Sequence, residues 1–235
     1  MQRLDRILSE AGVASRKELR AIIRAGRVTA DGAVVTDESR KFDETAVRVT
    51  VDGSPVRLRG PVLILLHKPA GYLTAADDPK AKTVMDLVPE AYRKLGVMPV
   101  GRLDKDTEGL LLLTNDGALT QRLLHPSHEV SKEYRVTVSG PVEHAAERLG
   151  RIRDVAGLPI RPAEVRQLSR QGNRAELSIT IHEGRNRQIR RMCAQYDLEV
   201  LRLQRVREHC LELGTLPSGR WRYLTPAEIA ALKDE

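Results

Sequence analysis

The sequence is poor in aromatic residues and in cysteine, and each shortage excludes a class of protein. Phenylalanine, tryptophan and tyrosine make up 3% of the 235 residues, too few for a surface that binds single-stranded nucleic acid by stacking alone. The two cysteines, Cys193 and Cys210, have no metal-ligand or Cys-x-x-Cys spacing, which indicates reduced thiols in a cytoplasmic protein. No apolar run approaches the roughly 18 residues of a membrane-spanning helix, so we expect no membrane association.

Cofactor motifs are missing as well. The chain has no glycine-rich dinucleotide fingerprint and no phosphate-binding Walker A sequence. Its six histidines are scattered, so a metal site would require folding to bring them together. We therefore expect neither a cofactor nor a bound metal ion.

Positive charge is the main compositional feature that is present. The chain has 39 Lys and Arg against 32 Asp and Glu, a formal net charge of +7 and a pI of about 9.6. Clustered Lys and Arg bind phosphates whatever the base sequence, so we expect a polyanionic partner. A hydrophobic content of 41% supplies a core for one large domain, or for a small domain and a medium one.

The N-terminal stretch predicts two short helices and a hairpin. Apolar spacing predicts a helix over 3–10, and the capping-box pair Ser15 and Glu18 begins a second helix over 15–25. Asp31-Gly32 between two short apolar stretches predicts a hairpin with a type I′ turn. Basic side chains recur along one face of the second helix and just beyond it: Arg16, Lys17, Arg20, Arg24 and Arg27. Taken alone, such a face is ordinarily a solvated surface.

Glycine, proline and serine between Asp52 and Pro61 indicate a connecting segment, so we place a domain boundary near residue 60, between 1–59 and 60–235. Strands are predicted over 62–66, 97–103, 110–114, 133–138, 175–181 and 199–206, and helices over 83–88, 118–124, 142–150, 186–195 and from Thr225 onward. The order lacks strict strand-helix-strand alternation. It favours an α+β fold, with a small helix-helix-hairpin domain and a larger domain built on a mixed, mainly antiparallel sheet.

The segment 101–117, GRLDKDTEGLLLLTNDG, sets a carboxylate beside a very apolar stretch. The four leucines predict a buried strand that ends in a tight turn at 115–117. Asp104 beside such a strand is partly desolvated and needs a partner, which makes it a candidate for chemistry. Arg102, two residues earlier on a predicted strand, shares its face. From these residues alone, an ion pair between Arg102 and Asp104 is the more ordinary interpretation.

Two resemblances to known families give these patterns a function. RLDRILSEAGVASRK, followed by IRAGRVTADG, resembles the S4 domain over roughly residues 2–50, which implies that the five basic residues above meet RNA phosphates. GRLD at 101–104, SKEYRV at 131–136 and EGRNRQIRRM at 183–192 resemble, in that order, motifs of the pseudouridine synthases that modify ribosomal RNA and carry an N-terminal S4 domain.

The second resemblance assigns roles to single residues. It implies that Asp104 is the catalytic aspartate, that Tyr134 stacks on the target base and that Arg190 pairs with Asp104. Leu203 corresponds to an apolar residue beneath the active site. Strand spacing, rather than the resemblance, makes Arg102 a candidate to hold the acid or an RNA phosphate. The remaining arginines of the third motif are left for phosphates: Arg185, Arg187 and Arg191. Weaker candidates for RNA contact are His67, Lys68 and Lys80. The reaction involves no redox change, so no cofactor is implied.

Two other functions stay open at this point. A non-catalytic ribosomal RNA-binding or assembly factor would use the S4 domain and the basic residues but not Asp104. A metal-dependent nuclease would hold Mg²⁺ with a cluster of acids: Asp104, Asp106, Glu108 and Asp116.

The target uridine is not identified by the sequence. GRLD with its KDTE extension resembles small-subunit enzymes, whereas the third motif resembles large-subunit enzymes. We expect ribosomal RNA as the partner, a monomer, and two domains joined flexibly near residue 60.

Overall fold

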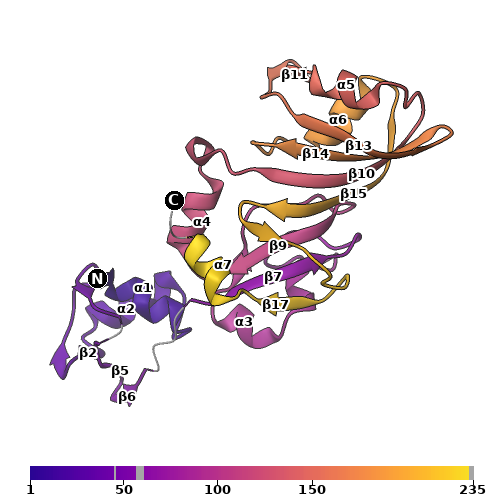
Figure 1. Ribbon diagram of the computed structural model, residues 1–235. Coiled ribbons are helices and arrows are strands. Elements are labelled where there is room, and N and C mark those ends of the chain that lie inside the picture. The colour runs from indigo at the N-terminus through magenta and orange to yellow at the C-terminus, as the bar shows by residue number, and fades with distance from the viewer. Residues whose placement is uncertain (45, 57–60, 233–235) are drawn as a thin grey trace.

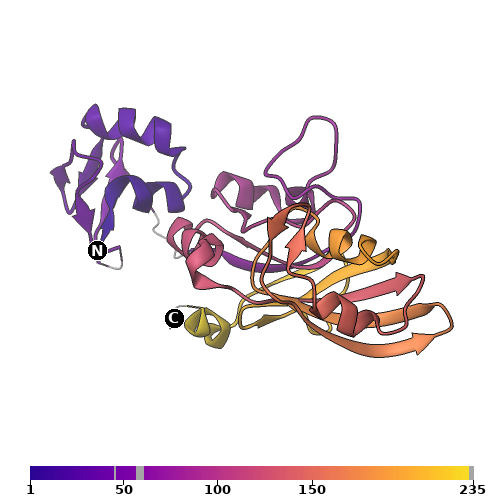
Figure 2. The same cartoon turned by 90° about the horizontal axis from the view of Figure 1, so that it is seen from above.

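The computed structural model describes all residues except 45, 57–60 and 233–235. The chain forms a small N-terminal lobe and a larger C-terminal lobe (Figure 1). Figure 2 shows the same two lobes from a direction turned by 90°, so their separation does not depend on the view. The predicted domain boundary near residue 60 falls within 57–60, outside the described residues.

The N-terminal lobe is the predicted helix-helix-hairpin unit with further short strands. Its elements are β1 (Gln2–Arg3), α1 (Leu4–Glu10), α2 (Arg16–Arg24), β2 (Val28–Ala30), β3 (Ala33–Val34), β4 (Lys41–Phe42), β5 (Val49–Val51) and β6 (Ser54–Pro55). The predicted capping box of Ser15 and Glu18 forms at the start of α2. Asp31 (φ 48°) and Gly32 (φ 81°) both have positive φ, which confirms the type I′ turn between β2 and β3.

The C-terminal lobe is built on one large sheet. Its elements are β7 (Leu63–Lys68), η1 (Val84–Leu87), α3 (Glu90–Lys94), β8 (Met98–Pro99), β9 (Glu108–Thr114), α4 (Gly117–Leu124), η2 (Pro126–His128), β10 (Lys132–Ser139), α5 (Ala145–Gly150), β11 (Asp154–Val155), β12 (Leu158–Pro159), β13 (Glu164–Gln171), β14 (Arg174–Ile181), α6 (Gln188–Ala194), β15 (Glu199–Glu208), β16 (Leu211–Glu212), β17 (Trp221–Tyr223) and α7 (Pro226–Ala231). The strand order is β13-β14-β10-β15-β9-β7-β17 (Figure 1). Neighbouring strands are antiparallel except β15 and β9, which confirms the predicted α+β fold with a mixed, mainly antiparallel sheet.

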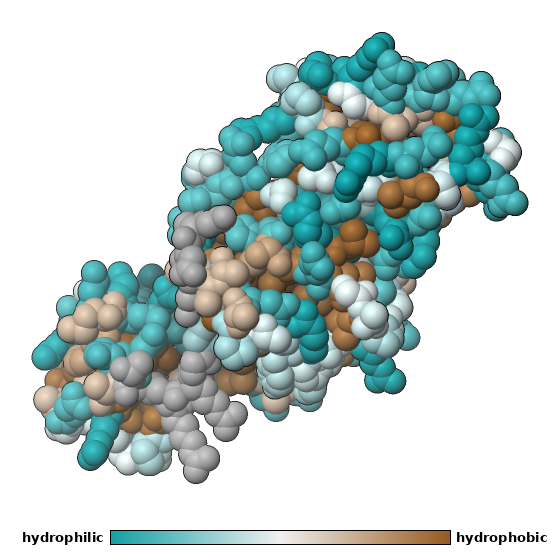
Figure 3. Space-filling view, in the orientation of Figure 1, coloured by the Kyte–Doolittle hydropathy of each residue, from teal (hydrophilic) through white to brown (hydrophobic). Residues whose placement is uncertain are grey.

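The middle strands of this sheet are buried on both faces, as their apolar runs predict. In β7, Ile64 and Leu66 belong to the cluster under α5 and α6, whereas Leu63 and Leu65 belong to the cluster under α4. The leucines of β9 divide between the clusters in the same alternating way. Full burial of a leucine contributes about 1.5–3 kcal/mol, so these two strands anchor the lobe. Figure 3 shows a mostly hydrophilic surface over α5 and β13, far from this centre.

Two predictions about the segment 97–117 are wrong. The strand predicted over 97–103 is limited to Met98–Pro99, because the chain turns at Gly101 with φ 71° and continues as a loop. The tight turn predicted at 115–117 is instead the start of α4, where the Asp116 side chain accepts hydrogen bonds from the backbone N–H groups of Ala118 and Leu119. Asp116 is therefore a helix cap.

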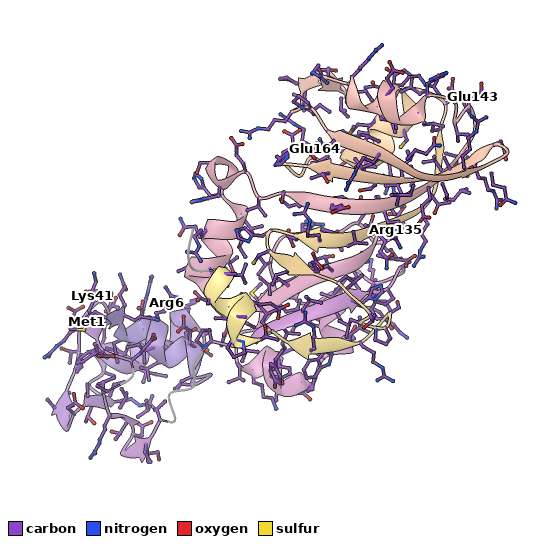
Figure 4. All side chains as sticks on the ribbon, in the orientation of Figure 1. Met1, Arg6, Lys41, Arg135, Glu143 and Glu164 are labelled. Carbon is purple, nitrogen blue, oxygen red and sulfur yellow. The ribbon has the colours of Figure 1, made fainter. Side chains whose placement is uncertain are left out.

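The two lobes touch directly as well as through the chain between them. Arg6 of α1 forms an ion pair with Asp116, with 2.7 Å between Nη2 and Oδ1. The Asn115 side chain donates to the backbone oxygen of Glu10 at 3.3 Å. Figure 4 labels Arg6 on α1, at the junction of the lobes. Among the described residues, the structure has no helix long and apolar enough to cross a membrane.

Candidate active site

A cleft of about 810 Å³ in the C-terminal lobe collects most of the residues that the motifs single out. Its walls come from the loop before β9, the end of α4 with the chain leading into β10, the loop between β14 and α6, and β15. The predicted site residues that line it are Arg102, Asp104, Tyr134, Arg185, Arg187 and Leu203. Three motifs that are far apart in the sequence therefore meet at one site.

Asp104 lies in the loop that leads into β9, and its side chain is 33% exposed. The backbone oxygen of Asp104 accepts a hydrogen bond from Thr107 N at 3.0 Å, which closes a turn. The nearest cation is Arg187, whose Nη1 lies 3.9 Å from Asp104 Oδ2. Arg102 is exposed at the same cleft. Among the described residues, it forms no ion pair with Asp104, so the simple pair considered from the sequence does not form.

Arg190 does not make the predicted ion pair with Asp104. Its Nη2 lies 3.1 Å from Asp106 Oδ2 and donates to the Asp106 backbone oxygen at 3.2 Å. The turn after Asp104 carries Asp106 toward the first turn of α6, and this explains the different partner. Partial burial would raise the pKa of Asp106, but the hydrogen bond from Arg187 and the charges of Arg190 and Arg187 bring it below its usual range.

The other two arginines of the third motif behave differently from each other. Arg185 reaches the cleft and donates from Nη2 to the backbone oxygen of Pro159 at 2.6 Å. Arg191 is exposed on α6 and donates to Asn186 Oδ1 at 3.0 Å. It does not line the cleft. The structure thus brings Arg185 and Arg187 to Asp104's cleft but not Arg191.

A buried lysine holds the loop of Asp104. Lys68, at the end of β7, is 0% exposed, so it is not an RNA contact. Its Nζ donates to the backbone oxygens of Pro69 at 3.1 Å, Lys105 at 3.2 Å and Thr107 at 2.8 Å. Burial lowers the pKa of Lys68 to about 8, against the opposing effect of nearby carboxylates. The feature of the sequence that could have indicated the burial of Lys68 is its position at the end of an apolar strand.

Tyr134 and Leu203 form an apolar side of the cleft, with exposures of 8% and 5%. Burial raises the pKa of Tyr134, and the Arg205 cation opposes that rise. Sequence reasoning missed Arg205, which is 2% exposed and pairs with Glu208. A signal was available, because Arg205 follows Leu203 by two residues on one strand and so shares its face.

An ion pair joins two segments of the cleft lining. Arg161, in the chain after β12, pairs with Glu129, in the chain between η2 and β10. Both side chains are about half exposed, so water screens the pair strongly. Lys132, also in the lining, is more buried, and burial lowers its pKa. The cleft lining therefore contains both cations and carboxylates, and several of its cations are paired.

The acids of the nuclease alternative do not gather at one point. Glu108 pairs with Arg202 at 2.9 Å, and Asp116 caps α4 and pairs with Arg6. Asp106 is occupied by Arg187 and Arg190. Within the described part of the chain, no group of three or more His, Cys, Asp or Glu side chains is arranged to hold a metal ion.

The basic residues of the N-terminal lobe lie apart from the cleft. Lys17 and Arg20 are exposed on α2. Arg24 pairs with Glu38 at 2.7 Å, and Arg27 donates to Asp52 at 2.8 Å. The side chain of Arg16 lies outside the described parts of the structure.

Comparison with known proteins assigns the chain to a family. The model of a family described as RNA pseudouridylate synthase matches residues 62–195, and that of the S4 domain matches residues 2–47. Proteins named ribosomal large subunit pseudouridine synthase B are 38% identical in Bacillus subtilis, covering 99% of this chain and 96% of that one, and 37% identical in Vibrio vulnificus, covering 99% and 75%. A solved pseudouridylate synthase superimposes with a TM-score of 0.67 at 28% identity, over 99% of this chain and all of its own. The cleft that unites the three motifs therefore lies in a member of the RNA pseudouridylate synthase family that also carries an S4 domain.

Proposed function

We propose that this enzyme isomerises a specific uridine of ribosomal RNA to pseudouridine, with Asp104 as its catalytic carboxylate and without a cofactor. The observation that carries the proposal is the position of Asp104, partly exposed in a cleft that also contains Tyr134, Leu203 and Arg187. The volume of about 810 Å³ lies in the range of sites that enclose a small ligand. A uridine turned out of its stack is such a ligand.

The reaction itself requires little beyond these groups. The bond between C1′ and N1 breaks, the uracil turns, and C5 bonds to C1′. The proton on C5 leaves and N1 takes up a proton, so no electrons are gained or lost. A carboxylate can act as a nucleophile or stabilise positive charge at the sugar. Asp104 supplies that carboxylate, and Tyr134 supplies an aromatic wall for the base.

The names of the two relatives favour large-subunit ribosomal RNA as the substrate. The S4 domain presents exposed cations on α2, and Arg102 and Arg185 add cations at the cleft. RNA would thus bind both domains through its phosphates. We propose that the enzyme acts as a monomer in the cytoplasm.

The test is tritium release from ribosomal RNA labelled at uridine C5, because forming the new bond expels that hydrogen. The wild type should release tritium from large-subunit RNA, and Asp104→Asn should release none above background while binding RNA as before. Asp77→Asn is the matched control, since its side chain is 85% exposed and does not line the cleft.

Three results would change the proposal. No release by the wild type from either subunit's RNA, with RNA binding intact, would favour the non-catalytic binding factor. Equal release by the wild type and Asp104→Asn would remove Asp104 from its role. Release from small-subunit RNA alone would correct the substrate.

A further inference from the structure

Two strands of the large sheet, β15 and β9, pair over only a short length beside the cleft, and we call this short pairing the seam. β15 and β9 pair in parallel through two residue pairs, the second of which joins Arg205 to Gly109. β9 follows the loop that carries Asp104, whereas β10, on the other side of β15, carries Tyr134. The placement of Tyr134 relative to Asp104 therefore depends on how the strands are held at this seam.

Arg205 crosses the seam with both its backbone and its side chain. A Cβ on Gly109, where φ is 110°, would lie 2.2 Å from the Arg205 backbone oxygen, so only glycine allows this approach. The Arg205 side chain donates from Nε to the Leu110 backbone oxygen on β9 at 2.8 Å. Its two terminal nitrogens each lie 3.1 Å from an oxygen of Glu208.

The same guanidinium faces Tyr134. Tyr134 and Arg205 are cross-strand partners of the antiparallel pair β10 and β15, so their side chains leave the sheet on one face. Both line the cleft. Arg205 Nη2 is buried, and Glu208 Oε2 lies 3.1 Å from it as an ion-pair partner, but no described residue accepts a hydrogen bond from Nη2 with acceptable geometry. A buried N–H without a partner is costly, and Tyr134, the cross-strand partner of Arg205, has a hydroxyl oxygen that can accept it.

We propose that Arg205, held by Glu208 and by the Leu110 carbonyl, is a positioning residue that donates an N–H to the hydroxyl oxygen of Tyr134. The Tyr134 O–H is then free to point into the cleft, toward the uracil and Asp104. This proposal rests on the proposed function. The charge of Arg205 also opposes the effect of burial on the Tyr134 pKa. Glu208 keeps the buried cation paired, so the arrangement avoids an isolated charge.

Three variants separate this role from a purely structural one. Arg205→Met removes both the N–H donors and the tie across the seam. Arg205→Lys keeps a cationic donor near Tyr134, but a lysine cannot replace the two-pronged contact with Glu208. Arg222→Met is the matched control, because Arg222 donates to both oxygens of Glu228 at 2.6 and 2.8 Å away from the cleft. Melting temperature, RNA affinity and single-turnover tritium release are measured for each.

We expect Arg205→Met to lower the maximal rate by about tenfold or more, as for a misplaced reactive group, with RNA affinity unchanged. Arg205→Lys should recover part of the rate without recovering the melting temperature, and Arg222→Met should keep the rate. Equal rates in Arg205→Met and Arg205→Lys, or a loss confined to RNA affinity, would overturn the proposal. If neither Arg205 variant folds, Glu208→Gln decides: an unchanged maximal rate refutes the role, and a lowered one with normal RNA affinity supports it. An inactive wild type would instead refute the proposed function.

Discussion

At the scale of single residues, Lys68 shows how burial gives a side chain a role that its type does not suggest. The lysine is fully buried and binds three backbone oxygens, two of which belong to the loop that carries Asp104. Its pKa of about 8 lies below the usual 10.5. The charged form of Lys68 therefore stabilises the position of the loop while it costs folding free energy through desolvation.

We predict that this lysine leaves a distinct pH signature on stability. Between pH 8 and 10.5 the unfolded chain keeps the Lys68 proton and the folded protein loses it, so stability from this group rises with pH in that window. The folding stability that Lys68 contributes is fully present above pH 10.5 and is lost as the pH falls through 8. The unfolding free energy of the wild type minus that of Lys68→Met, measured by denaturant titration, should increase from pH 8 to pH 10.5.

The matched control for that prediction is Lys94→Met, because Lys94 is 76% exposed. Lys94→Met removes the same charge from the surface, so a pH trend shared by both variants would come from the lost charge and not from the burial of Lys68. A pH-independent difference for Lys68→Met would show that Lys68 titrates as an ordinary lysine. Lys68→Met should also lower tritium release by about tenfold to a hundredfold, which is the cost of displacing a catalytic group such as the one proposed for Asp104.

Sequence reasoning was effective for residues that local motifs mark and failed for residues that depend on a distant partner. Asp104 and Tyr134 stand in contiguous motifs, and the fold brings both to one cleft. The partner of Arg190 was predicted wrongly, because a turn two residues long decides whether Asp104 or Asp106 faces α6. Arg205 had no motif to mark it, since its function depends on burial between strands that are distant in sequence.

At the scale of elements, buried strands and capped helices were predictable, whereas exposed strands were not. β7 and β9 appear as apolar runs, and a capping box begins α7 at Thr225 as predicted. β13 was missed because nearly all of its side chains are exposed, which leaves no apolar pattern. It is a strand because it pairs with β14, a cause that lies outside its own residues.

Helix α2 permits a prediction about which cations bind RNA. Lys17 and Arg20 are exposed, and within the described residues no carboxylate lies at ion-pair distance from either, whereas Arg24 and Arg27 already pair with Glu38 and Asp52. Replacing Lys17 and Arg20 by alanine should therefore weaken ribosomal RNA binding about tenfold and lower the salt slope by about two.

The comparison that tests this is the double alanine variant of Arg24 and Arg27, which removes the same charge from the same lobe. Its salt slope should change less, because the carboxylates of Glu38 and Asp52 already offset these cations. Filter binding over a range of salt concentrations measures both variants. Equal slopes would mean that RNA displaces the carboxylates and that all four cations contact phosphate.

At the scale of the whole molecule, the contact between the lobes limits where the S4 domain can sit. Arg6 reaches Glu10 at 2.6 Å and Asp116 at 2.7 Å, and all three side chains are mostly buried. Asp116 caps α4, whose far end reaches the cleft through Leu123 and Leu124. These contacts tie the S4 domain to α4, whereas the flexible connection predicted near residue 60 falls outside the described residues and stays a prediction.

We predict that Arg6→Ala loosens this tie and leaves Glu10 and Asp116 buried without their cation, which is unfavourable. Once the S4 domain is no longer held near the cleft, RNA bound to it has a lower effective concentration at the active site. The half-saturating concentration of full-length ribosomal RNA should rise about threefold to tenfold, by the same effective-concentration argument. The maximal rate should stay unchanged, and small-angle scattering should show a larger radius of gyration.

Lys41→Ala is the control, because it removes an equal charge from the exposed side chain of Lys41, which Figure 4 labels. Among the described residues, Lys41 makes no contact across the junction. If Lys41→Ala raises the half-saturating concentration as much as Arg6→Ala does, lost charge explains the effect. If a short RNA that spans only the cleft is affected as strongly as full-length RNA, the S4 domain does not act through proximity.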